Sequence, residues 1–553
     1  MSTDEPQLAS PPADASDHRG RRRLPSKWIW LAIAVMGLLG AVVQGTDLLR
    51  DHALANIATC VLVFVAMAIL AIWFLFFSGF SWRWRLLVLC GCVAGVTLFA
   101  VLFRIERFSG EMLPSFAYRF SAKPDWLLQS SLPQLADGKA KVNVDLRTTT
   151  QTDFPQFLGP TRSNTVTHIR LARHWTDQPP KCIWRHAIGA GWSAFAAVNW
   201  HAVTMEQRGQ SEMVTCYSIQ TGQLEWVYAT AVRYENLQGG VGPRSTPTIS
   251  EGMVYAIGTL GHLMCLDGAT GKCLWEKDLL REYGVTYDDE TAAVPWGRAG
   301  SPLVVGDRVI VPAGGTKDKR FVSLAAYDKR HGTRVWEGGN RQISYSSPAL
   351  VTLAGAEQIV IANEDTLSGH NVQTGKLLWE HPWPGRANAN PNVCQAVPIS
   401  PNRIFVSKGY GKGAMLIQLD PSAGGTFATQ VIWSSPKLMK TKFSNVTVLG
   451  GYVYGLSDGV LECLDLAHGL SKWKAGRYGH GQMLGVGDLL LVLSENGEVA
   501  LVEATPDRPN HVLGRFPAIE GMTWNNLALY GPYLLVRNAE EAACYKLPLE
   551  ERR

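Results

Sequence analysis

The stretch CLDGATGKCLW, from Cys265 to Trp275, decides the fold, because its pattern returns several times along the chain. It reads as a strand, a turn built around Thr-Gly, and a short strand that ends in Trp. Asp267 can accept hydrogen bonds from its own turn, Gly271 permits a positive φ, and Trp275 presents a large ring to a neighbouring sheet. One such hairpin cannot bury both of its faces, so it predicts a repeat architecture.

Further copies of this pattern follow at regular spacing. Clear copies are CYSIQTGQLEW (Cys216–Trp226), AYDKRHGTRVW (Ala326–Trp336), HNVQTGKLLW (His370–Trp379) and CLDLAHGLSKW (Cys463–Trp473), with a weaker copy from Leu416 to Trp433. The closing tryptophans, which we expect to dock between sheets, are Trp184, Trp226, Trp275, Trp336, Trp379, Trp433 and Trp473. A degenerate eighth unit ends near Phe516. The repeat length of about 45 residues is typical of four-stranded propeller blades.

The two ends of the repeat region complement each other. Lys181–Trp184 reads as an outer strand with no preceding unit, and Leu527–Leu547 reads as three strands with no closing Trp. We predict that the early strand closes the last sheet. The predicted fold class is therefore all-β, an eight-bladed β-propeller with tryptophan-docking repeats, preceded by three transmembrane α-helices.

Cysteines occupy matching positions in two of these units. Cys265 and Cys273 lie ten and two residues before Trp275, and closure of the ring puts Cys544 and Cys182 in the same two positions. The sequence predicts that each pair consists of cross-strand neighbours able to form a disulfide outside the cytoplasm. Alternatively, these cysteines are small buried hydrophobic residues, like other cysteines at the first position with none opposite.

The N-terminal part of the chain has a different character. Residues 1–27 predict a disordered basic tail, which ends in Arg19, Arg21, Arg22, Arg23 and Lys27. Three segments without Lys, Arg, Asp or Glu follow, at Trp28–Gln44, Leu54–Phe80 and Leu86–Phe103. Each is near or above the length that crosses a bilayer, so residues 28–104 predict three transmembrane helices.

Basic residues in the flanks of these segments predict the orientation. The tail is basic and the second loop carries Arg83 and Arg85, whereas the first loop carries only Arg50. Because cytoplasmic flanks are enriched in Lys and Arg, the tail and second loop are expected in the cytoplasm. Three spans then place everything after Arg104 on the other side, with a connector at 105–152 and the propeller at 153–553.

Composition excludes other classes of protein. Lys and Arg number 52 against 47 Asp and Glu, with no long basic run beyond the first 27 residues, so no nucleic-acid partner is expected. The 13 histidines show no HExxH motif, and we predict no metal site. GYGKGA, at Gly409–Ala414, lacks the spacing of a phosphate loop and favours a bend between strands.

Stretches outside the repeats carry a family resemblance. They are DFPQFLGPTRSN (Asp153–Asn164), GPRSTP (Gly242–Pro247), REYG with WGRAGSPLVVGDRVIV (Arg281–Val311), YSSPAL (Tyr345–Leu350), SKGYGKGA (Ser407–Ala414) and SENGEV (Ser494–Val499). With the motif Ala-x-Asp-x-x-x-Gly-x-x-x-Trp, they resemble the PQQ-binding-like, quinoprotein-type β-propellers of bacteria, of the BamB-like group. The resemblance covers about residues 153 to 548.

The resemblance leaves two functions open, because quinoprotein dehydrogenases and non-catalytic assembly or scaffold proteins share the repeat. The dehydrogenases carry an adjacent Cys-Cys pair over the quinone, a Trp beneath it, and Ca²⁺ held by carboxylate and amide oxygens beside an Asp base. This chain has 10 cysteines and no adjacent pair. Amide oxygens could come from Asn388, Asn390 and Asn392, and a carboxylate from Glu364 or Asp365. Such Asn-rich loops are more often turns.

We expect any binding site where the innermost strands begin, because propellers present those residues around the central channel. The candidate channel-mouth residues are Trp192, Arg244, Arg298, Tyr345, Asn390, Asn392, His480 and Asn525, with Ser193, Phe443, Asn445, Gln482 and Trp524 beside them. One interpretation is that these groups bond neighbouring loops and solvate the channel. The other is that the forked donors of Arg244 and Arg298 receive a carboxylate-bearing ligand or an acidic loop of a partner.

The predicted function is a membrane-anchored, extracytoplasmic propeller that serves as a protein- or ligand-binding platform without catalysis. The alternative is a PQQ-dependent dehydrogenase of alcohols or sugars, and a lesser one is a sensor of small solutes or glycans. No cofactor is expected except PQQ and calcium under the first alternative. The expected partners are the lipid bilayer and an unknown protein or small ligand at the channel. The expected location is the bacterial inner membrane, with the propeller in the periplasm or otherwise outside the cytoplasm.

Overall fold

The computed structural model describes residues 24–46, 48–128, 144–399 and 401–550. It divides into two compact units, of which the first comprises Met1–Leu48 and Leu54–Arg104, and the second comprises Leu49–Ala53 and Ile105–Arg553. The arginines of the predicted basic tail (Arg19, Arg21, Arg22 and Arg23) lie outside the described residues.

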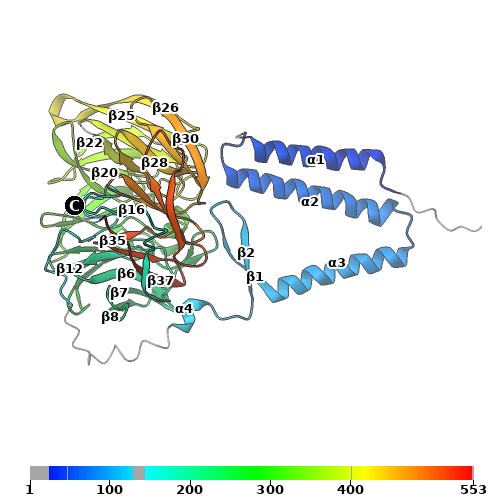
Figure 1. Cartoon of the computed structure of the whole chain (residues 1–553), viewed down its shortest axis with the longest axis horizontal. Helices are drawn as coiled ribbons and strands as arrows, with labels where there is room; N and C mark the ends of the chain where they lie inside the picture. The colour runs from blue at the N-terminus through cyan, green and yellow to red at the C-terminus, as the bar shows by residue number, and fades with distance from the viewer. Residues whose placement is uncertain (1–23, 47, 129–143, 400, 551–553) are drawn as a thin grey trace, which may run out of the picture. The chain divides into compact units, whose positions relative to one another are not determined.

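The first unit consists of α1 (Lys27–Gly45), α2 (His52–Phe77) and α3 (Trp82–Leu102), shown in blue in Figure 1. Among the described residues these three helices are long and apolar enough to cross a membrane. The last helix begins earlier than the sequence predicted, so Arg83 and Arg85 lie in its first turn and not in a loop. Long basic side chains tolerate this position, because they can reach the headgroup level from a helix end.

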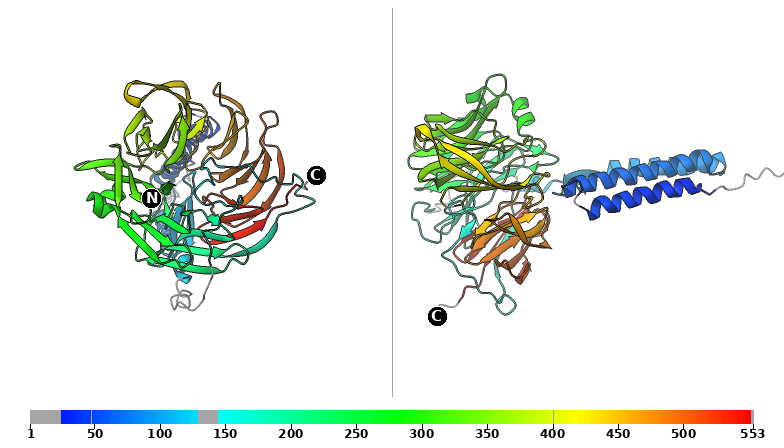
Figure 2. Two further views of the ribbon diagram at one scale, coloured as in Figure 1. Left: turned by 90° about the vertical axis from the view of Figure 1, so that its left-hand side faces the viewer. Right: turned by 90° about the horizontal axis from the view of Figure 1, so that it is seen from above.

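The second unit is an eight-bladed β-propeller, as far as the described residues extend, and the left view of Figure 2 shows its sheets around a common centre. Blade 1 is β5 (Ala196–Val198), β6 (His201–Arg208), β7 (Ser211–Ser218) and β8 (Leu224–Thr230). Blade 2 is β11 (Thr248–Ser250), β12 (Met253–Ile257), β13 (His262–Asp267) and β14 (Cys273–Asp278). Blade 3 is β15 (Leu303–Val305), β16 (Arg308–Thr316), β17 (Arg320–Asp328) and β18 (Arg334–Gly338). Blade 4 is β19 (Ala349–Leu353), β20 (Ala356–Ala362), β21 (Thr366–Asn371) and β22 (Leu377–Pro382).

The remaining blades follow the same antiparallel order. Blade 5 is β23 (Val397–Ile399), β24 (Arg403–Lys408), β25 (Gly413–Pro421) and β26 (Phe427–Ser435). Blade 6 is β27 (Thr447–Leu449), β28 (Tyr452–Ser457), β29 (Val460–Asp465) and β30 (Leu470–Arg477). Blade 7 is β31 (Gln482–Val486), β32 (Leu489–Leu493), β33 (Glu498–Glu503) and β34 (Val512–Pro517), with β3 (Thr165–Val166) added in parallel to β31. Blade 8 is β35 (Ala528–Tyr530), β36 (Tyr533–Arg537), β37 (Glu541–Lys546) and β4 (Lys181–Ala187).

Shorter elements flank the blades. The segment before the propeller contains β1 (Phe103–Phe108), β2 (Pro114–Tyr118) and α4 (Pro124–Leu127). The loops of blades 1 to 3 contain β9 (Glu235–Asn236), β10 (Gly240–Val241), α5 (Leu279–Tyr283) and α6 (Tyr287–Ala293), and η2 (Ala423–Gly425) lies in the outer hairpin of blade 5.

The ring closes as the sequence predicted, because β4 pairs antiparallel with β37. Buried apolar side chains cluster between neighbouring blades; for example, Val214 of blade 1 and Met264 of blade 2 share one cluster. Each sheet thus buries its faces against its neighbours, which a single blade cannot do.

A β-bulge recurs in the outer strand pair of every blade. In blade 2, Cys265 pairs with Trp275 and Leu266 with Cys273, so Leu274 is the extra residue. The register shifts at the same place in the other seven blades. The extra residue immediately precedes the docking position and is Glu225, Leu274, Val335, Leu378, Ile432, Lys472, Leu513 or Ile183 in the respective blades.

The closing tryptophans dock onto the next blade. Trp226 donates from Nε1 to the carbonyl oxygen of Gly268 at 2.9 Å, and Trp184, Trp275, Trp336, Trp433 and Trp473 make the equivalent bond to the following blade. Trp379 instead donates to Gln358 of its own blade. Gly271 has φ 71° and lies so close to Trp226 that a Cβ there would be 2.7 Å from a ring carbon. This glycine therefore serves both the turn and the docking.

Blade 7 departs from the prediction at its closing residue. Its docking position is Gly514, which pairs with Leu501, and not Phe516. Trp175, from the segment that precedes the propeller, packs over Gly514, where a Cβ would lie 2.6 Å from the Cβ of Trp175. The missing tryptophan of the repeat is thus replaced by one from elsewhere in the chain.

The predicted cysteine pairing is wrong by one residue. Because of the bulge, Cys182 lies opposite Tyr545 and Cys544 opposite Trp184. Likewise, Cys273 lies opposite Leu266 and not opposite Cys265. All 10 cysteines lie within the described residues and are free thiols.

Candidate functional site

Side chains at the start of the innermost strands bind one blade to the next around the channel. The Ala194 amide donates to Thr246 Oγ1 at 3.1 Å, the Thr246 amide to Ser301 Oγ at 2.9 Å, and the Ser301 amide to Ser347 Oγ at 2.9 Å. The Gln395 amide likewise donates to Asn445 Oδ1 at 2.9 Å. Each of these residues stands two positions before its innermost strand, so the repeat itself sets the ring.

Several predicted channel-mouth residues meet in an aromatic cluster. The rings of Trp192 and Trp524 lie 4.8 Å apart, and Phe443 lies 4.7 Å from Trp524 and 5.3 Å from His480. Trp192 also donates from Nε1 to the carbonyl oxygen of Gly239 at 2.7 Å. The mouth is therefore filled with aromatic rings between blades 6, 7, 8 and 1.

His480 is fully enclosed. Its backbone amide donates to Glu495 at 3.0 Å, and among the described residues both ring nitrogens lack a hydrogen-bond partner. Burial, assisted by Lys442 and Arg477, holds the pKa of His480 well below its ordinary value, so its ring is neutral. The β1–β2 turn covers it, because Gly110 lies against the imidazole and a Cβ there would clash with the ring.

The same turn is fixed by further polar contacts. Glu495 accepts from the Gly110 amide at 3.0 Å, and Lys442 Nζ donates to the Gly110 carbonyl at 3.2 Å. Lys442 also pairs with Asp51, which belongs to the same unit, at 3.0 Å. Beside the turn lies a depression of about 1050 Å³. Several of its lining charges are paired with one another, as in Arg477–Glu111 at 2.7 Å, Arg107–Glu540 at 2.5 Å and Arg515–Glu498 at 3.2 Å.

Arg298 has an internal partner, which sequence reasoning did not foresee. It is 2% exposed, and its guanidinium bonds both carboxylate oxygens of Glu290 at 2.6 and 3.1 Å. Its remaining nitrogen donates to the carbonyl oxygens of Pro312 and Ala313. Arg298 therefore joins α6 to blade 3, and its fork has no capacity left for a second carboxylate.

Arg244 differs, because within the described residues it forms no ion pair. It is half-buried, and its guanidinium donates to the carbonyl oxygens of Gly239 and Gly240 at 2.6 and 3.2 Å and to that of Gly242. The guanidinium carbon lies 5.6 Å from the ring centre of Tyr234. Burial lowers the pKa of Arg244 to about 10, so it stays charged at neutral pH. Glu212 is near enough to interact with it electrostatically but forms no ion pair with it. A half-buried cation without a carboxylate in direct contact is a group that an anion would stabilise.

Tyr345, another predicted channel-mouth residue, stacks on the ring of Trp296. Its ring lies 5.1 Å from that of Trp296, and its hydroxyl donates to the Ala387 carbonyl at 3.1 Å and accepts from the Trp296 amide at 3.2 Å. Burial raises the pKa of Tyr345 above its ordinary value. Tyr345 is thus a positioning group that joins the loops before blades 3 and 5.

Two of the predicted asparagines are fixed by hydrogen bonds that their side-chain NH₂ groups donate. Asn392 donates to the carbonyl oxygens of Asn363, Glu364 and Trp383, and Asn525 donates to those of Gly191 and Ser193. Their acceptor oxygens are the unused atoms. Among the described residues, buried oxygens near the channel without a partner belong to Ser245, Ser346, Asn390, Asn392, Gln395, Ser444, Gln482 and Asn525. Such a set of acceptors suits water or a ligand rich in hydrogen-bond donors.

Sequence reasoning missed Arg162, which lies at the centre of the blades. It is 5% exposed and donates to Pro348 O at 2.7 Å, to Ser301 O at 3.3 Å and to Pro302 O. Gln395 donates back to its carbonyl oxygen at 3.1 Å. Burial lowers the pKa of Arg162 to about 9. The motif Asp153–Asn164, which contains Arg162, therefore binds the segments that lead into the innermost strands of blades 3 to 5. The position of Arg162 in that motif was the sequence feature that could have identified it.

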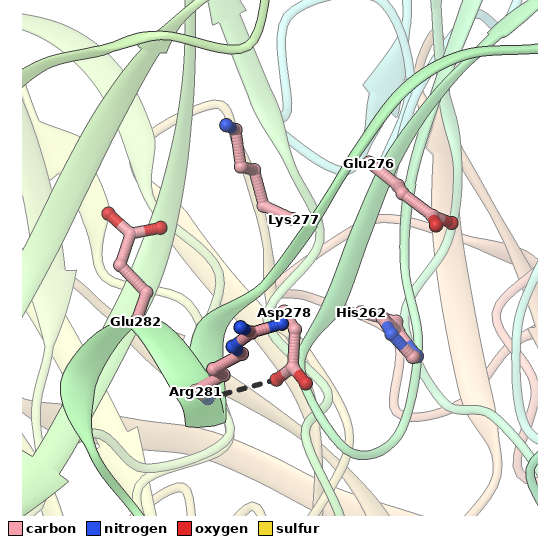
Figure 3. A pocket seen from close by; sticks show the side chains of 6 residues that line it. All are labelled: His262, Glu276, Lys277, Asp278, Arg281 and Glu282. Atoms are coloured by element: carbon pink, nitrogen blue, oxygen red, sulfur yellow. Dashed lines mark hydrogen bonds between the residues drawn. The ribbon is translucent and has the colours of Figure 1, made fainter.

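A second depression, of about 550 Å³, lies by the outer strands of blade 2 and is shown in Figure 3. Its acidic groups have structural partners. Asp278 accepts from the Arg281 amide at 3.1 Å as the cap of α5, and Glu276 accepts from Tyr228 at 3.1 Å. Glu282 accepts from Arg334 at 2.8 Å. This depression offers no group poised for chemistry among the described residues.

Comparison with known proteins agrees with this architecture. Residues 209–475 match the sequence profile of a family described as outer membrane protein assembly factor BamB. The chain thus carries an eight-bladed β-propeller, part of whose sequence is similar to this BamB family of PQQ-type repeats. No curated protein sequence matches the chain.

Solved structures are similar at low sequence identity. Quinohemoprotein alcohol dehydrogenase from Comamonas testosteroni has 13% identity and a TM-score of 0.50, covering 78% of this chain and 85% of its own. The quinohemoprotein alcohol dehydrogenase ADHIIG from Pseudomonas putida HK5 has 13% identity and a TM-score of 0.51, covering 74% and 84%. BamB from Moraxella catarrhalis has 16% identity and a TM-score of 0.48, covering 66% and 100%. Similarity at this level concerns the fold.

Proposed function

We propose that this chain is a membrane-anchored propeller that binds a partner or ligand at its channel mouth, outside the cytoplasm, without catalysing a reaction. The observation that carries the proposal is Arg244, a half-buried guanidinium with no carboxylate partner among the described residues. An acidic group of a partner loop, or of a small ligand, would supply the missing charge. The BamB-like propeller supports a role in protein binding.

The proposed location rests on the flanks of the three candidate spans. The second of the two short loops is followed by Arg83 and Arg85, and the first loop carries only Arg50. Because basic flanks stay in the cytoplasm, an odd number of spans exports the propeller. The bilayer is then one partner, and the acidic group at Arg244 comes from the extracytoplasmic side.

The residues at the mouth do not fit the quinone and calcium of the alternative function. A quinone needs a planar slot above a Trp, but Trp192 and Trp524 pack on each other with centroids 4.8 Å apart. Of the candidate carboxylates, Glu364 accepts from the Ala387 amide at 3.2 Å and Asp365 lies 3.6 Å from Arg341. No catalytic step is therefore derived through PQQ.

Reconstitution tests the proposal against that alternative. The full chain in detergent is mixed with PQQ and Ca²⁺, freed of excess by gel filtration, and assayed for quinone absorbance and for dye reduction with alcohols and aldose sugars. We expect neither signal. Stoichiometric quinone with substrate-dependent dye reduction would overturn the non-catalytic role. A sensor of small solutes would instead give ligand-dependent thermal stabilisation without dye reduction.

A further inference from the structure

Three side chains with metal-binding atoms converge in blade 1, away from the channel mouth. They are His201 at the start of β6, Cys216 on β7 and Glu225 on β8. His201 Nδ1 lies 2.6 Å from Glu225 Oε2, and Cys216 Sγ lies 3.5 Å from the same oxygen. All three ligand atoms lie within 4.8 Å of one another. Within the described residues this is the one such group of His, Cys, Asp and Glu side chains.

The position of Glu225 is unusual for the repeat. It is the extra residue of the bulge, where six of the other blades have Leu, Ile or Val and one has Lys472. Several of these residues are exposed, such as Leu274 at 52% and Val335 at 47%, whereas the side chain of Glu225 is 10% exposed. A bulge redirects the side chain that it carries, and here it directs a carboxylate toward a buried thiol.

The cysteine alone is not special, because Cys265 and Cys463 occupy the same position in blades 2 and 6. What differs is the pair of neighbours. The residues equivalent to His201 and Glu225 are Met253 and Leu274 in blade 2, and Tyr452 and Lys472 in blade 6. Only blade 1 therefore combines an imidazole, a thiol and a carboxylate at this place.

We propose that His201, Cys216 and Glu225 form a binding site for one Zn²⁺ ion, with three protein ligands and a fourth position for water. Imidazole nitrogen, thiolate sulfur and carboxylate oxygen are the donors that zinc takes in proteins. Tetrahedral zinc with bonds of about 2.0 to 2.3 Å separates its ligand atoms by roughly 3.3 to 3.6 Å. The Cys216–Glu225 separation of 3.5 Å already matches, and the His201–Glu225 contact must open from 2.6 Å.

The charge of the ligand set suits the ion. The Cys216 thiol is fully buried and lies beside the Glu225 carboxylate. On binding, Zn²⁺ displaces the thiol proton into solvent, and one thiolate and one carboxylate then neutralise the two positive charges. The His201 proton moves from Nδ1 to Nε2 with no further change in charge.

Metal binding also has a structural consequence outside the blade. In the structure the Asp145 amide donates to His201 Nε2 at 3.3 Å. After the tautomer change Nε2 carries hydrogen and cannot accept, so this bond must break. The segment that enters the propeller at Val144 is then held by the other contacts of Asp145, such as the bond from Asn199 at 3.0 Å.

Cobalt spectroscopy tests this site independently of the proposed function. The purified full chain in detergent is titrated with Co²⁺, and the thiolate-to-cobalt charge-transfer band and tetrahedral ligand-field bands are recorded. We expect one Co²⁺ per chain, displaced by Zn²⁺, and faster hydrogen exchange at the Asp145 amide. A wild-type chain with no charge-transfer band would overturn the proposal.

Variants assign the band to blade 1. Cys216→Ser should abolish it, whereas Cys463→Ser, which removes an equally buried cysteine at the same repeat position, should leave it unchanged. Persistence of the band in Cys216→Ser, or its loss in Cys463→Ser, would overturn the assignment. If Cys216→Ser does not fold, Glu225→Gln serves instead, since its side chain keeps the same shape. A folded Glu225→Gln protein with an unchanged band would reject the site.

Discussion

Trp175 packs over Gly514, which holds the position that a docking tryptophan occupies in the other blades. Its ring is 3% exposed and lies 5.7 Å from that of Phe516. Its Nε1 has no hydrogen-bond partner among the described residues, unlike the tryptophans that donate to the following blade. Blade 7 therefore takes its aromatic ring, but not the inter-blade hydrogen bond, from the segment before the propeller.

Removing this ring should destabilise the propeller as much as removing a docking tryptophan. Trp175→Ala deletes a buried aromatic side chain, so we expect a loss of roughly 3 to 5 kcal/mol in the free energy of unfolding. Trp275→Ala is the comparison, because Trp275 is 9% exposed and stands in the repeat itself. Urea unfolding of the full chain in detergent measures both. A loss below about 1 kcal/mol for Trp175→Ala would show that its ring does not support blade 7.

Ala substitutions at two glycines distinguish the cost of backbone strain from the cost of a clash with a docked tryptophan ring. Gly271 and Gly306 both have positive φ, at 71° and 55°, but only Gly271 lies against a ring, that of Trp226. Gly306→Ala should cost roughly 1 to 2 kcal/mol, the strain of the left-handed conformation alone. Gly271→Ala should cost clearly more, because the indole of Trp226 must move. Equal melting temperatures for the two variants would contradict the docking geometry.

The architecture could be predicted because short, local sequence patterns determine it. Turn glycines, closing tryptophans and their spacing are periodic, and they predicted the blades and the closure through β4 correctly. The bulge was not visible, because one extra residue in a strand leaves hydrophobic alternation almost unchanged. Because of that single residue, Cys182 lies opposite Tyr545 and not opposite Cys544.

The candidate site was less predictable, since it depends on contacts between distant segments. Arg244 and Arg298 look alike in sequence, and only α6 distinguishes them by supplying Glu290 to Arg298. Likewise, nothing in the local sequence indicates that Arg162 reaches three blades or that Gly110 covers His480. Sequence located the mouth residues but not their partners.

Acidification should weaken the propeller through His370. This imidazole is buried, and its contacts with Ser368 Oγ at 2.9 Å and Gly375 O at 3.1 Å suit the neutral form. Burial lowers its pKa from 6.5 to about 4. Above pH 6.5 neither the folded nor the unfolded state is protonated there, but between 6.5 and 4 only the unfolded state binds the proton. Stability therefore falls as the pH decreases, by up to about 1.4 kcal/mol per pH unit.

One variant isolates this contribution. His370→Asn should flatten the pH dependence of the free energy of unfolding below pH 6.5, because Asn does not titrate there. Urea titrations at a series of pH values give the slopes. Parallel profiles for His370→Asn and the wild type would contradict the lowered pKa, because they mean that the folded state binds this proton as readily as the unfolded state.

The orientation of the chain is testable in cells. Because Arg83 and Arg85 flank the second loop, alkaline phosphatase fused after residue 150 should be exported and active. A fusion at Arg83 should be inactive, since it ends in the cytoplasm. The reverse pair of activities would place the propeller in the cytoplasm.

Site-specific photo-crosslinking tests the binding role of the channel mouth most directly. The probe is a photoreactive phenylalanine at Tyr287, which is 55% exposed and lies near Tyr234, the ring beneath Arg244. Illumination of cells should give one dominant adduct, reduced several-fold by Arg244→Ala and unchanged by Arg330→Ala on an exposed outer turn. An adduct that Arg244→Ala leaves undiminished, in a protein that melts like the wild type, would contradict a binding platform at this mouth.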